Sequence, residues 1–442
     1  MLTGLALLLV ATGGPAARAA NQPQPPPPPS PASAWLDDVV SVSVGGGYSG
    51  ALRSDGTVLI WGEIIDDEIE FRAGQPFPRQ VCDVGQLPPC TRFLDRVTAI
   101  AVGNDHALAL RSDGTVVGWG LGVPYGAGVG DGTNRNSGRP TQVCDVGQVA
   151  PCTRFLDRVT AISVSHGYSM ALRSDGTVVT WGTGYVGDGT TGTRLTPLQV
   201  CDVGQTAPCI RFLDRVTAIS TSGEQGMAVR ADGTVVTWGT NLDGVLGNGL
   251  QGTPGDGDDR LTPVRVCDVG QSAPCTTFLD RVVAVAGDYQ TGVASRSDGT
   301  AVAWGTGYTG DGTVAARLTP VRICDVGQTA PCTRFLDQVT DVSSELLLRA
   351  DGTVVGRVGR TRTPEPVCDV GQTEPCTRFL DRVTAIARGF DSGAHLAVRS
   401  DGTVAAWGWN RLGQLGDGTT ISRPTPVLVC NAGRTTPCPI GP

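Results

Sequence analysis

The chain has 442 residues, a formal net charge of −8 and no lysine, so all of its cationic side chains apart from histidine are arginine. Scattered arginines in an acidic chain do not form the basic surface that nucleic-acid binding requires. The absence of lysine excludes P-loop and Schiff-base chemistry, and three histidines leave little for metal binding or histidine-driven catalysis. We therefore expect no nucleic-acid partner, no metal site and no cofactor.

The N-terminal region has the pattern of a targeting segment followed by a spacer. A short apolar run precedes the small-x-small sequence Ala17-Arg18-Ala19, which predicts a signal peptide over residues 1–19; a disordered Ala-rich tail is the alternative. Residues 20–34 are Pro-rich and predict a polyproline II linker, with a ligand for an aromatic groove as the less favoured reading. No apolar run is long enough to span a bilayer, so we expect a secreted or extracytoplasmic protein.

Residues 35–442 repeat one unit seven times. The segment ALRSDGTVLIWG at 51–62 recurs, with small changes, at 109–120, 171–182, 228–239, 294–305, 347–358 and 397–408. In each copy an Asp-Gly turn separates short runs of small and β-branched residues, which is the signature of a β-hairpin, and no long helical stripe occurs. The spacing of the units is close to the roughly 40–60 residues of a propeller blade. The sequence therefore predicts an all-β, seven-bladed β-propeller.

The two ends of the repeat region predict a closed ring. Each internal unit ends in Cys-x7-Cys and an RFLDRV-like tail, such as residues 92–97. This tail is missing after Cys438, whereas a spare copy stands at residues 35–39. We therefore expect the two termini to complete one unit together, with Trp35 near Cys438.

The repeated pattern V-x-x-I-x-x-G…(H)-x-x-A-L-x-x-D-G-x-V-x-x-W-G…G-x-L-G-x-G resembles the repeat of the regulator of chromosome condensation family, above all at WGWNRLGQLGDGT (407–419). The resemblance covers residues 35–442 and implies a seven-bladed propeller that binds protein partners. The eukaryotic founder of the family is a guanine-nucleotide exchange factor on chromatin. This sequence differs by its signal peptide, by a Cys hairpin in every unit, and by lacking both a basic tail and a wedge segment. We expect the fold to carry over and the exchange activity not to.

The 14 cysteines form seven Cys-x7-Cys pairs, one per unit. They are Cys82 with Cys90, Cys144 with Cys152, Cys201 with Cys209, Cys267 with Cys275, Cys324 with Cys332, Cys368 with Cys376, and Cys430 with Cys438. Gly and Pro within each loop mark a turn, so we predict seven local disulfides, each stabilising by about 2.5 kcal/mol. Zinc is the weaker alternative, because no histidine accompanies a pair and the spacing is wrong. Each bridge is expected to stiffen a surface hairpin rather than to clamp the ring.

Single residues in the units have structural interpretations. His106 stands at the family's histidine position, and we expect a hydrogen-bonded inner-strand residue rather than a catalytic one. The recurrent tryptophans are expected to pack between blades; they are Trp61, Trp119, Trp181, Trp238, Trp304 and Trp407. Arg357 replaces tryptophan in the sixth and shortest unit, which is the predicted weak point of the ring. The acidic segments 63–70 and 256–259 lack calcium-ligand spacing, so solvated loops are favoured over calcium sites.

The loops after each Trp-Gly differ in length, and variable loops on a rigid scaffold commonly carry binding. Five of them hold one aromatic residue each: Phe71, Tyr125, Tyr185, Tyr308 and Trp409. We predict that these aromatics lie on one face and anchor a partner; packing over the blade tops is the alternative. The function predicted is a secreted, monomeric, non-catalytic scaffold for a protein partner. The alternatives are an extracellular enzyme inhibitor resembling a β-lactamase inhibitory protein, an exchange factor, and, least favoured, an enzyme.

Overall fold

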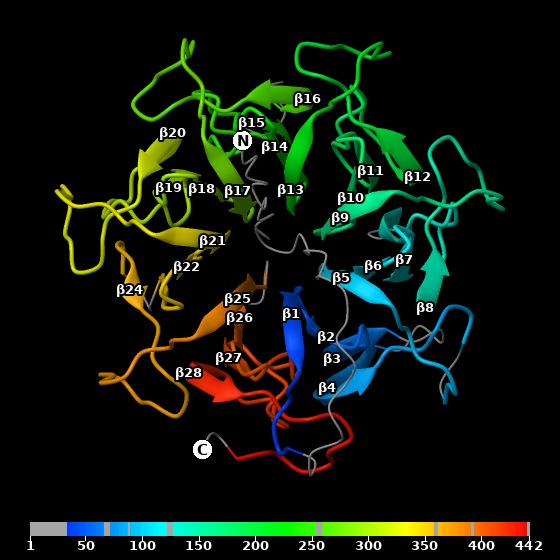
Figure 1. Ribbon diagram of the computed structural model, residues 1–442. Coiled ribbons are helices and arrows are strands. Elements are labelled where there is room, and N and C mark those ends of the chain that lie inside the picture. Colours follow the sequence, from blue (N-terminus) through cyan, green and yellow to red (C-terminus); the bar gives the residue numbers. More distant parts are fainter. Residues whose placement is uncertain are drawn as a thin grey trace, which may run out of the picture.

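The computed structural model describes residues 33–65, 71–86, 89–121, 127–252, 259–357, 361–389 and 393–439. Seven four-stranded antiparallel sheets stand in a ring around a central axis (Figure 1). Each sheet is a meander of four strands that are consecutive in the chain, and the first strand of each lies nearest the axis. The predicted all-β, seven-bladed propeller is confirmed.

The first four blades follow one another in chain order. Blade 1 holds β1 (Val39–Val44), β2 (Tyr48–Arg53), β3 (Val58–Ile65) and β4 (Phe71–Gln80). Blade 2 holds β5 (Val97–Val102), β6 (His106–Arg111), β7 (Val116–Gly120) and β8 (Ser137–Gln142), with the short 3-10 helix η1 (Ala127–Val129) before β8. Blade 3 holds β9 (Val159–Val164), β10 (Tyr168–Arg173), β11 (Val178–Gly182) and β12 (Arg194–Gln199). Blade 4 holds β13 (Val216–Ser222), β14 (Gln225–Arg230), β15 (Val235–Gly239) and β16 (Arg260–Arg265).

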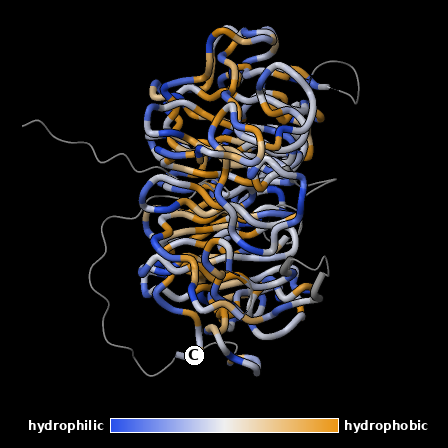
Figure 2. The backbone as a smooth tube through the Cα atoms, turned by 90° about the vertical axis from the view of Figure 1, so that its right-hand side faces the viewer, coloured by the Kyte–Doolittle hydropathy of each residue, from blue (hydrophilic) through white to orange (hydrophobic). Residues whose placement is uncertain are grey.

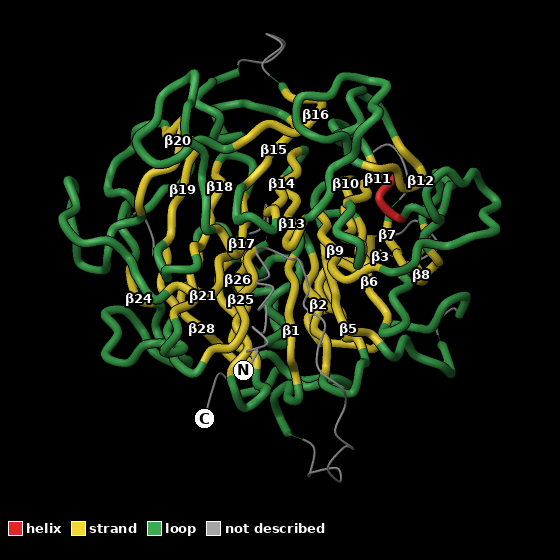
Figure 3. The backbone as a smooth tube through the Cα atoms, turned by 45° about the horizontal axis from the view of Figure 1, so that its top comes forward, coloured by secondary structure: helices red, strands yellow, loops and turns green. Residues whose placement is uncertain are grey.

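The remaining three blades complete the circle, and the sixth has the shortest strands. Blade 5 holds β17 (Val282–Gly287), β18 (Thr291–Arg296), β19 (Ala301–Gly305) and β20 (Arg317–Arg322). Blade 6 holds β21 (Val339–Ser343), β22 (Leu346–Arg349), β23 (Val354–Gly356) and β24 (Glu365–Pro366). Blade 7 holds β25 (Val383–Arg388), β26 (Ala394–Arg399), β27 (Val404–Gly408) and β28 (Arg423–Leu428). Figure 3 shows the strands lining the ring, with loops above and below them.

The Asp-Gly-Thr turn between the second and third strands of a blade is built from local hydrogen bonds. In blade 1, Asp55 Oδ1 accepts the backbone N–H of Thr57 at 2.9 Å and the Thr57 hydroxyl at 2.7 Å. Gly56 has φ +84°, which a side chain would strain. In blades 2 and 3, the matching threonine hydrogen bonds lower the pKa of Asp113 and Asp175. The repeated Ser-Asp-Gly-Thr is therefore a turn, as predicted.

The apolar core is divided among the seven junctions between neighbouring blades, inside the disc that Figure 2 shows edge-on. Six junctions each contain one of the recurrent tryptophans, namely Trp61, Trp119, Trp181, Trp238, Trp304 and Trp407. The predicted packing role of these residues is confirmed. The junction between blades 5 and 6 is built from aliphatic side chains, and none of the described residues in its core is aromatic.

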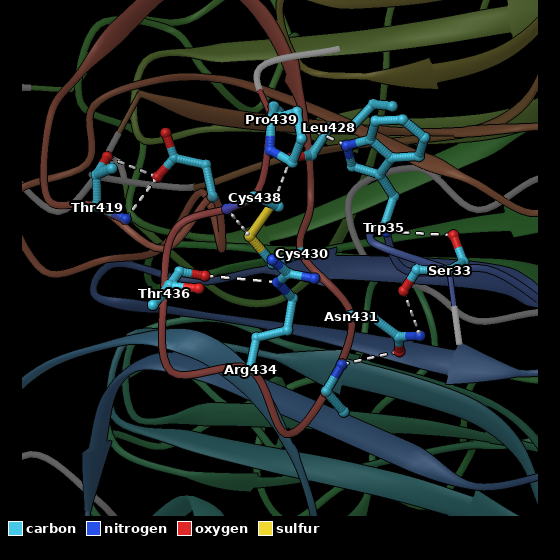
Figure 4. Close-up of a disulfide and its surroundings, with 12 residues drawn as sticks. Ser33, Trp35, Thr419, Leu428, Cys430, Asn431, Arg434, Thr436, Cys438 and Pro439 are labelled. Atoms are coloured by element: carbon cyan, nitrogen blue, oxygen red, sulfur yellow. Dashed lines mark hydrogen bonds between the residues drawn. A yellow bond between two sulfur atoms is a disulfide. The ribbon is translucent and has the colours of Figure 1, made fainter. Parts of the chain in front are cut away.

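The two ends of the repeat region meet and complete one unit (Figure 4). Trp35 forms an antiparallel bridge with Cys430, and its indole Nε1 donates to the carbonyl of Pro439 at 3.1 Å. In the other units a phenylalanine bridges the first Cys in the same way, as Phe93 does to Cys82. The backbone N–H of Leu36 donates to Val429 O at 2.9 Å, and the Leu36 side chain is fully buried. The predicted closure is confirmed.

All seven predicted Cys pairs are disulfides, with Cα–Cα distances of 5.6 to 5.8 Å. The bonds join Cys82 to Cys90, Cys144 to Cys152, Cys201 to Cys209, Cys267 to Cys275, Cys324 to Cys332, Cys368 to Cys376, and Cys430 to Cys438. This pairing is the one predicted, and it is consistent with an oxidising environment.

The connections that carry the first six disulfides are uniform, and they project at the rim between blades (Figure 1). Each runs from the last strand of one blade to the first strand of the next, and all six have the same length. They are residues 81–96, 143–158, 200–215, 266–281, 323–338 and 367–382. A single hairpin design is therefore repeated around the ring.

The hairpins also link neighbouring blades through an aspartate, although each disulfide joins two cysteines of the same hairpin. The aspartate after the first Cys pairs with an arginine on the second strand of the next blade, as Asp83 does with Arg111 at 2.9 Å and Asp268 with Arg296 at 2.8 Å. The same pairs join Asp145 to Arg173, Asp202 to Arg230 and Asp369 to Arg399. At the closure, Asn431 accepts from Arg53 at 3.0 Å. Five of the described hairpins therefore have both a local disulfide and an ion pair to the next blade.

Removing one bridge with Cys201→Ser and Cys209→Ser is expected to lower the free energy of unfolding by about 2.5 kcal/mol, because the nine-residue loop regains entropy in the unfolded chain. Urea unfolding followed by circular dichroism measures the loss. Mass spectrometry of the unreduced wild type should show no free thiol. Alkylation of any cysteine in the folded, unreduced protein would contradict the seven-bridge assignment.

The signal peptide predicted over residues 1–19 and nearly all of the linker predicted over 20–34 lie outside the described residues. Within the described part of the chain, no helix has the length and apolar character needed to cross a membrane.

Candidate functional site

The meander topology gives the ring two unlike faces. In each blade the first and third connections lie at one end of the sheet, and the second lies at the other. The backbone N–H of Thr183 donates to Gly167 O at 2.8 Å, which joins the third and first connections of blade 3. We call this side the loop face. The opposite side, formed by the Asp-Gly turns and the Cys hairpins, is the hairpin face.

The third connections vary in length, whereas the hairpins do not. The third connection is 357–364 in blade 6 and 183–193 in blade 3, but it is 240–259 in blade 4, more than twice as long as in blade 6. All of these connections emerge on the loop face because the strands alternate in direction. The variable parts of the repeat are therefore gathered on one side of a ring whose other side is uniform.

The five loop aromatics have different surroundings. The Tyr185 hydroxyl donates to Asp259 Oδ2 at 2.6 Å, and this hydrogen bond raises the pKa of Tyr185 to about 12. Both Tyr185 and Trp409 are partly exposed on the loop face. Tyr308 is buried, as the alternative of packing over the blade tops predicts, and its role as a partner contact stays a prediction. Tyr125 and the side chain of Phe71 lie outside what the structure describes.

The acidic segments considered for calcium are only partly described. Asp259 is held by the Tyr185 hydroxyl and by the backbone N–H of Asn241, at 2.6 and 2.9 Å. Residues 66–70 and 256–258 lie outside the described residues. Within residues 33–65, 71–86, 89–121, 127–252, 259–357, 361–389 and 393–439, no group of three or more His, Cys, Asp or Glu side chains is placed to hold a metal ion.

His106 lies in a buried hydrogen-bonded chain between blades 2 and 3. Its Nδ1 lies 2.9 Å from Asp105 Oδ1 and its Nε2 lies 2.6 Å from Ser169 Oγ, which donates to Gly128 O at 2.9 Å. This order of groups is that of a serine-hydrolase triad. However, the side chains of His106 and Ser169 are completely buried, and the Ser169 hydroxyl already donates its hydrogen bond to the carbonyl of Gly128. The predicted role of a hydrogen-bonded inner residue is confirmed.

Comparison with known families agrees with this geometry. Residues 97–126 and residues 401–438 each match a model described as "Regulator of chromosome condensation (RCC1) repeat". The chain contains RCC1 repeats. The first match lies in blade 2 and the second in blade 7, so matching repeats occur in separate parts of the ring.

Curated relatives of the RCC1-repeat propeller have diverse roles. This chain is 26% identical over 348 residues to the ultraviolet-B receptor UVR8 of Arabidopsis thaliana, and the match covers 76% of this chain and 70% of UVR8. It is 30% identical over 217 residues to the human E3 ubiquitin-protein ligase HERC2, covering 49% of this chain but only 4% of HERC2. A chain in the crystal structure of Kap60 bound to yeast RCC1 (Prp20) is 18% identical with a TM-score of 0.59, over 94% of this chain and 91% of that one. This last likeness shows the fold alone.

The loop face of this RCC1-repeat propeller holds a group that the sequence did not single out. At the mouth of the axis, Tyr289 Oη and Asn104 Nδ2 lie 3.4 and 3.5 Å from His166 Nδ1. These residues come from the first connections of blades 5, 2 and 3, and Tyr289 is partly exposed. All three residues follow the first strand of a blade, so the repeat pattern alone could have placed them on the same face near the axis.

Proposed function

We propose that this RCC1-repeat propeller is a non-catalytic scaffold that binds a protein partner through its loop face. The observation that carries the proposal is the contrast between the faces: third connections of very different length on one side, and hairpin connections of a single length on the other. A rigid framework that varies only in its surface loops is the usual arrangement of a binding module. The partly exposed Tyr185, Tyr289 and Trp409 supply the aromatic contacts that anchor protein interfaces.

Affinity capture with quantitative mass spectrometry tests this proposal. The bait is the purified protein, and the loop-face variant carries Tyr289→Ala with Trp409→Ala. The matched control is Phe155→Ala with Phe212→Ala, because both rings are partly exposed on the hairpin face. We expect a specific partner to be lost with the loop-face variant and retained with the control. Loss with the control alone would reject the loop face as the binding surface.

The same capture separates the proposed scaffold from its alternatives. A secreted hydrolase as the partner, with its activity blocked in the complex, would favour the inhibitor reading. A small GTPase as the partner, with its nucleotide release accelerated in the complex, would favour an exchange factor. One relative is named for this activity, the bovine "Secretion-regulating guanine nucleotide exchange factor". Fractionation of producing cells tests the proposed signal peptide and secretion, since these predict the protein in the medium or the periplasm.

A further inference from the structure

Blade 6 differs from the other blades in the residue pair between its second and third strands. In four blades a Ser or Gly lies opposite the tryptophan, in the pairs Ser49 with Trp61, Ser169 with Trp181, Gly226 with Trp238 and Gly292 with Trp304. Glu345 and Arg357 stand at these positions in blade 6, as the register of the neighbouring pairs shows. Arg357 Nη1 lies 2.9 Å from Glu345 Oε1. An ion pair therefore occupies the place of an aromatic ring.

This ion pair belongs to a network that spans three blades. Arg388 of blade 7 places Nη2 3.4 Å from Glu345 Oε2 and Nη1 3.2 Å from Asp288 Oδ2 of blade 5. The Ser344 hydroxyl donates to Asp288 Oδ2 at 2.7 Å. The side chains of Asp288, Glu345 and Arg388 are only 12 to 14% exposed. We call the alternating charges Asp288, Arg388, Glu345 and Arg357 the charged seam.

The junction beside the seam differs from the other junctions in its core and in its ion pair to the hairpin. Among its described core residues, between blades 5 and 6, none is aromatic. The ion pair between the hairpin and blade 6 uses another aspartate, because Arg349 binds Asp337, which is 65% exposed at the end of the hairpin, at 3.2 Å. The closure here therefore combines an aliphatic core with the ion pairs of the charged seam, and its described residues lack the buried indole of the other six junctions.

Arg357 of the charged seam also lies beside Tyr308, one of the five aromatic residues predicted to anchor a partner. The guanidinium carbon of Arg357 lies 6.0 Å from the centroid of the Tyr308 ring, and Tyr308 is 5% exposed. Burial raises the pKa of Tyr308 well above its ordinary value, so the phenol stays neutral. On the far side of the seam, His395 stacks on Trp407 with ring centroids 5.2 Å apart. Separation of Arg357 from Glu345 would uncover Tyr308 on the loop face.

We propose that the charged seam is an electrostatic latch, and that the ring opens locally at blade 6 when the latch is weakened. Salt screens an ion pair to the degree that the pair is exposed, and Arg357, whose side chain is 34% exposed, is the accessible end of the seam. The junctions with tryptophan have, besides their Asp–Arg pairs, a large apolar contact that salt does not weaken. Local opening follows the least stable unit of a fold. The latch therefore makes exposure of Tyr308 depend on ionic strength, while the other junctions stay closed.

Hydrogen exchange with mass spectrometry on the whole protein tests the latch. In low salt, amides of residues 339–356 should exchange faster than the equivalent residues 159–180 of blade 3. Raising sodium chloride to about 1 M, where the Debye length falls to about 3 Å, should accelerate exchange in blade 6 several-fold and leave blade 3 unchanged. Equal exchange in the two blades, or no response to salt in blade 6, would overturn the proposal.

Two variants distinguish a latch from a blade that is merely short. Glu345→Gln removes the charge that bridges Arg357 and Arg388, and it should accelerate exchange in blade 6 by roughly tenfold or more. Glu345→Ser with Arg357→Trp installs the pair found in blade 3, and it should slow exchange and abolish its salt response. The rate at which tetranitromethane modifies Tyr308, relative to that of buried Tyr168, should be highest in Glu345→Gln, intermediate in the wild type and lowest in the Ser/Trp variant. Undiminished salt dependence in the Ser/Trp variant would contradict the latch even if Glu345→Gln failed to fold.

Discussion

Replacing Trp304 by alanine is expected to lower the free energy of unfolding by about 3–5 kcal/mol, because it leaves a large cavity between blades 4 and 5. The indole is completely buried, and its Nε1 donates to Val245 O of the preceding blade at 2.7 Å. Gly292 lies against the ring so closely that an added Cβ would stand 2.3 Å from it, which shows how tightly the site is packed. Chemical denaturation followed by circular dichroism measures the change.

Trp409→Ala is the matched control for that experiment, because Trp409 follows the blade-7 Trp-Gly and is partly exposed in a loop. Its loss should change stability by less than about 1 kcal/mol. If Trp304→Ala were as mild as Trp409→Ala, tryptophan packing between blades would not be what holds the ring together.

Leu36→Ala is expected to lower the free energy of unfolding by about 2–5 kcal/mol, although Leu36 lies close to the predicted linker. Its side chain is fully buried in the core between blades 7 and 1, and its backbone N–H bonds to Val429. Loss of its methyl groups leaves a cavity at the one junction that joins the two ends of the repeat region. The same unfolding measurement applies.

Leu213→Ala is the internal reference for ring closure. Leu213 holds the equivalent place in the hairpin before blade 4, is also completely buried, and donates its N–H to Val200 O at 2.8 Å. Both substitutions should destabilise the protein to a similar extent. A large cost for Leu213→Ala together with almost none for Leu36→Ala would mean that the termini do not close the ring in solution.

The repeat itself is why so much of the fold is predictable from the sequence. Seven copies of one hairpin sequence pattern predict the blades, and the recurrent tryptophan predicts the packing between them. The spare copy of the repeat's tail at Trp35-Leu36 predicts how the ring closes. These features are local in the chain or repeated in it. Even the role of His106 follows from the rule that buried polar groups find hydrogen-bond partners.

The features that could not be predicted from the sequence depend on contacts between units. The pairing of Asp83 with Arg111 joins residues 28 apart on different blades, so neither residue marks it locally. Tyr308 and Tyr185 occupy equivalent loop positions, yet Tyr308 is buried, with Arg357 of the next blade beside its ring. The charged seam requires residues from three blades at once. The sequence identified Arg357 as a lost tryptophan, but not the ion pairs that replace it.

Differential hydrogen exchange of the protein with and without its captured partner tests the central claim, that a protein binds the loop face. We expect protection in the loop-face connections, including 183–193 and 409–422, with the hairpins at 200–215 and 266–281 unchanged. Protection confined to the hairpins would contradict the claim, and place the partner on the opposite side of the ring.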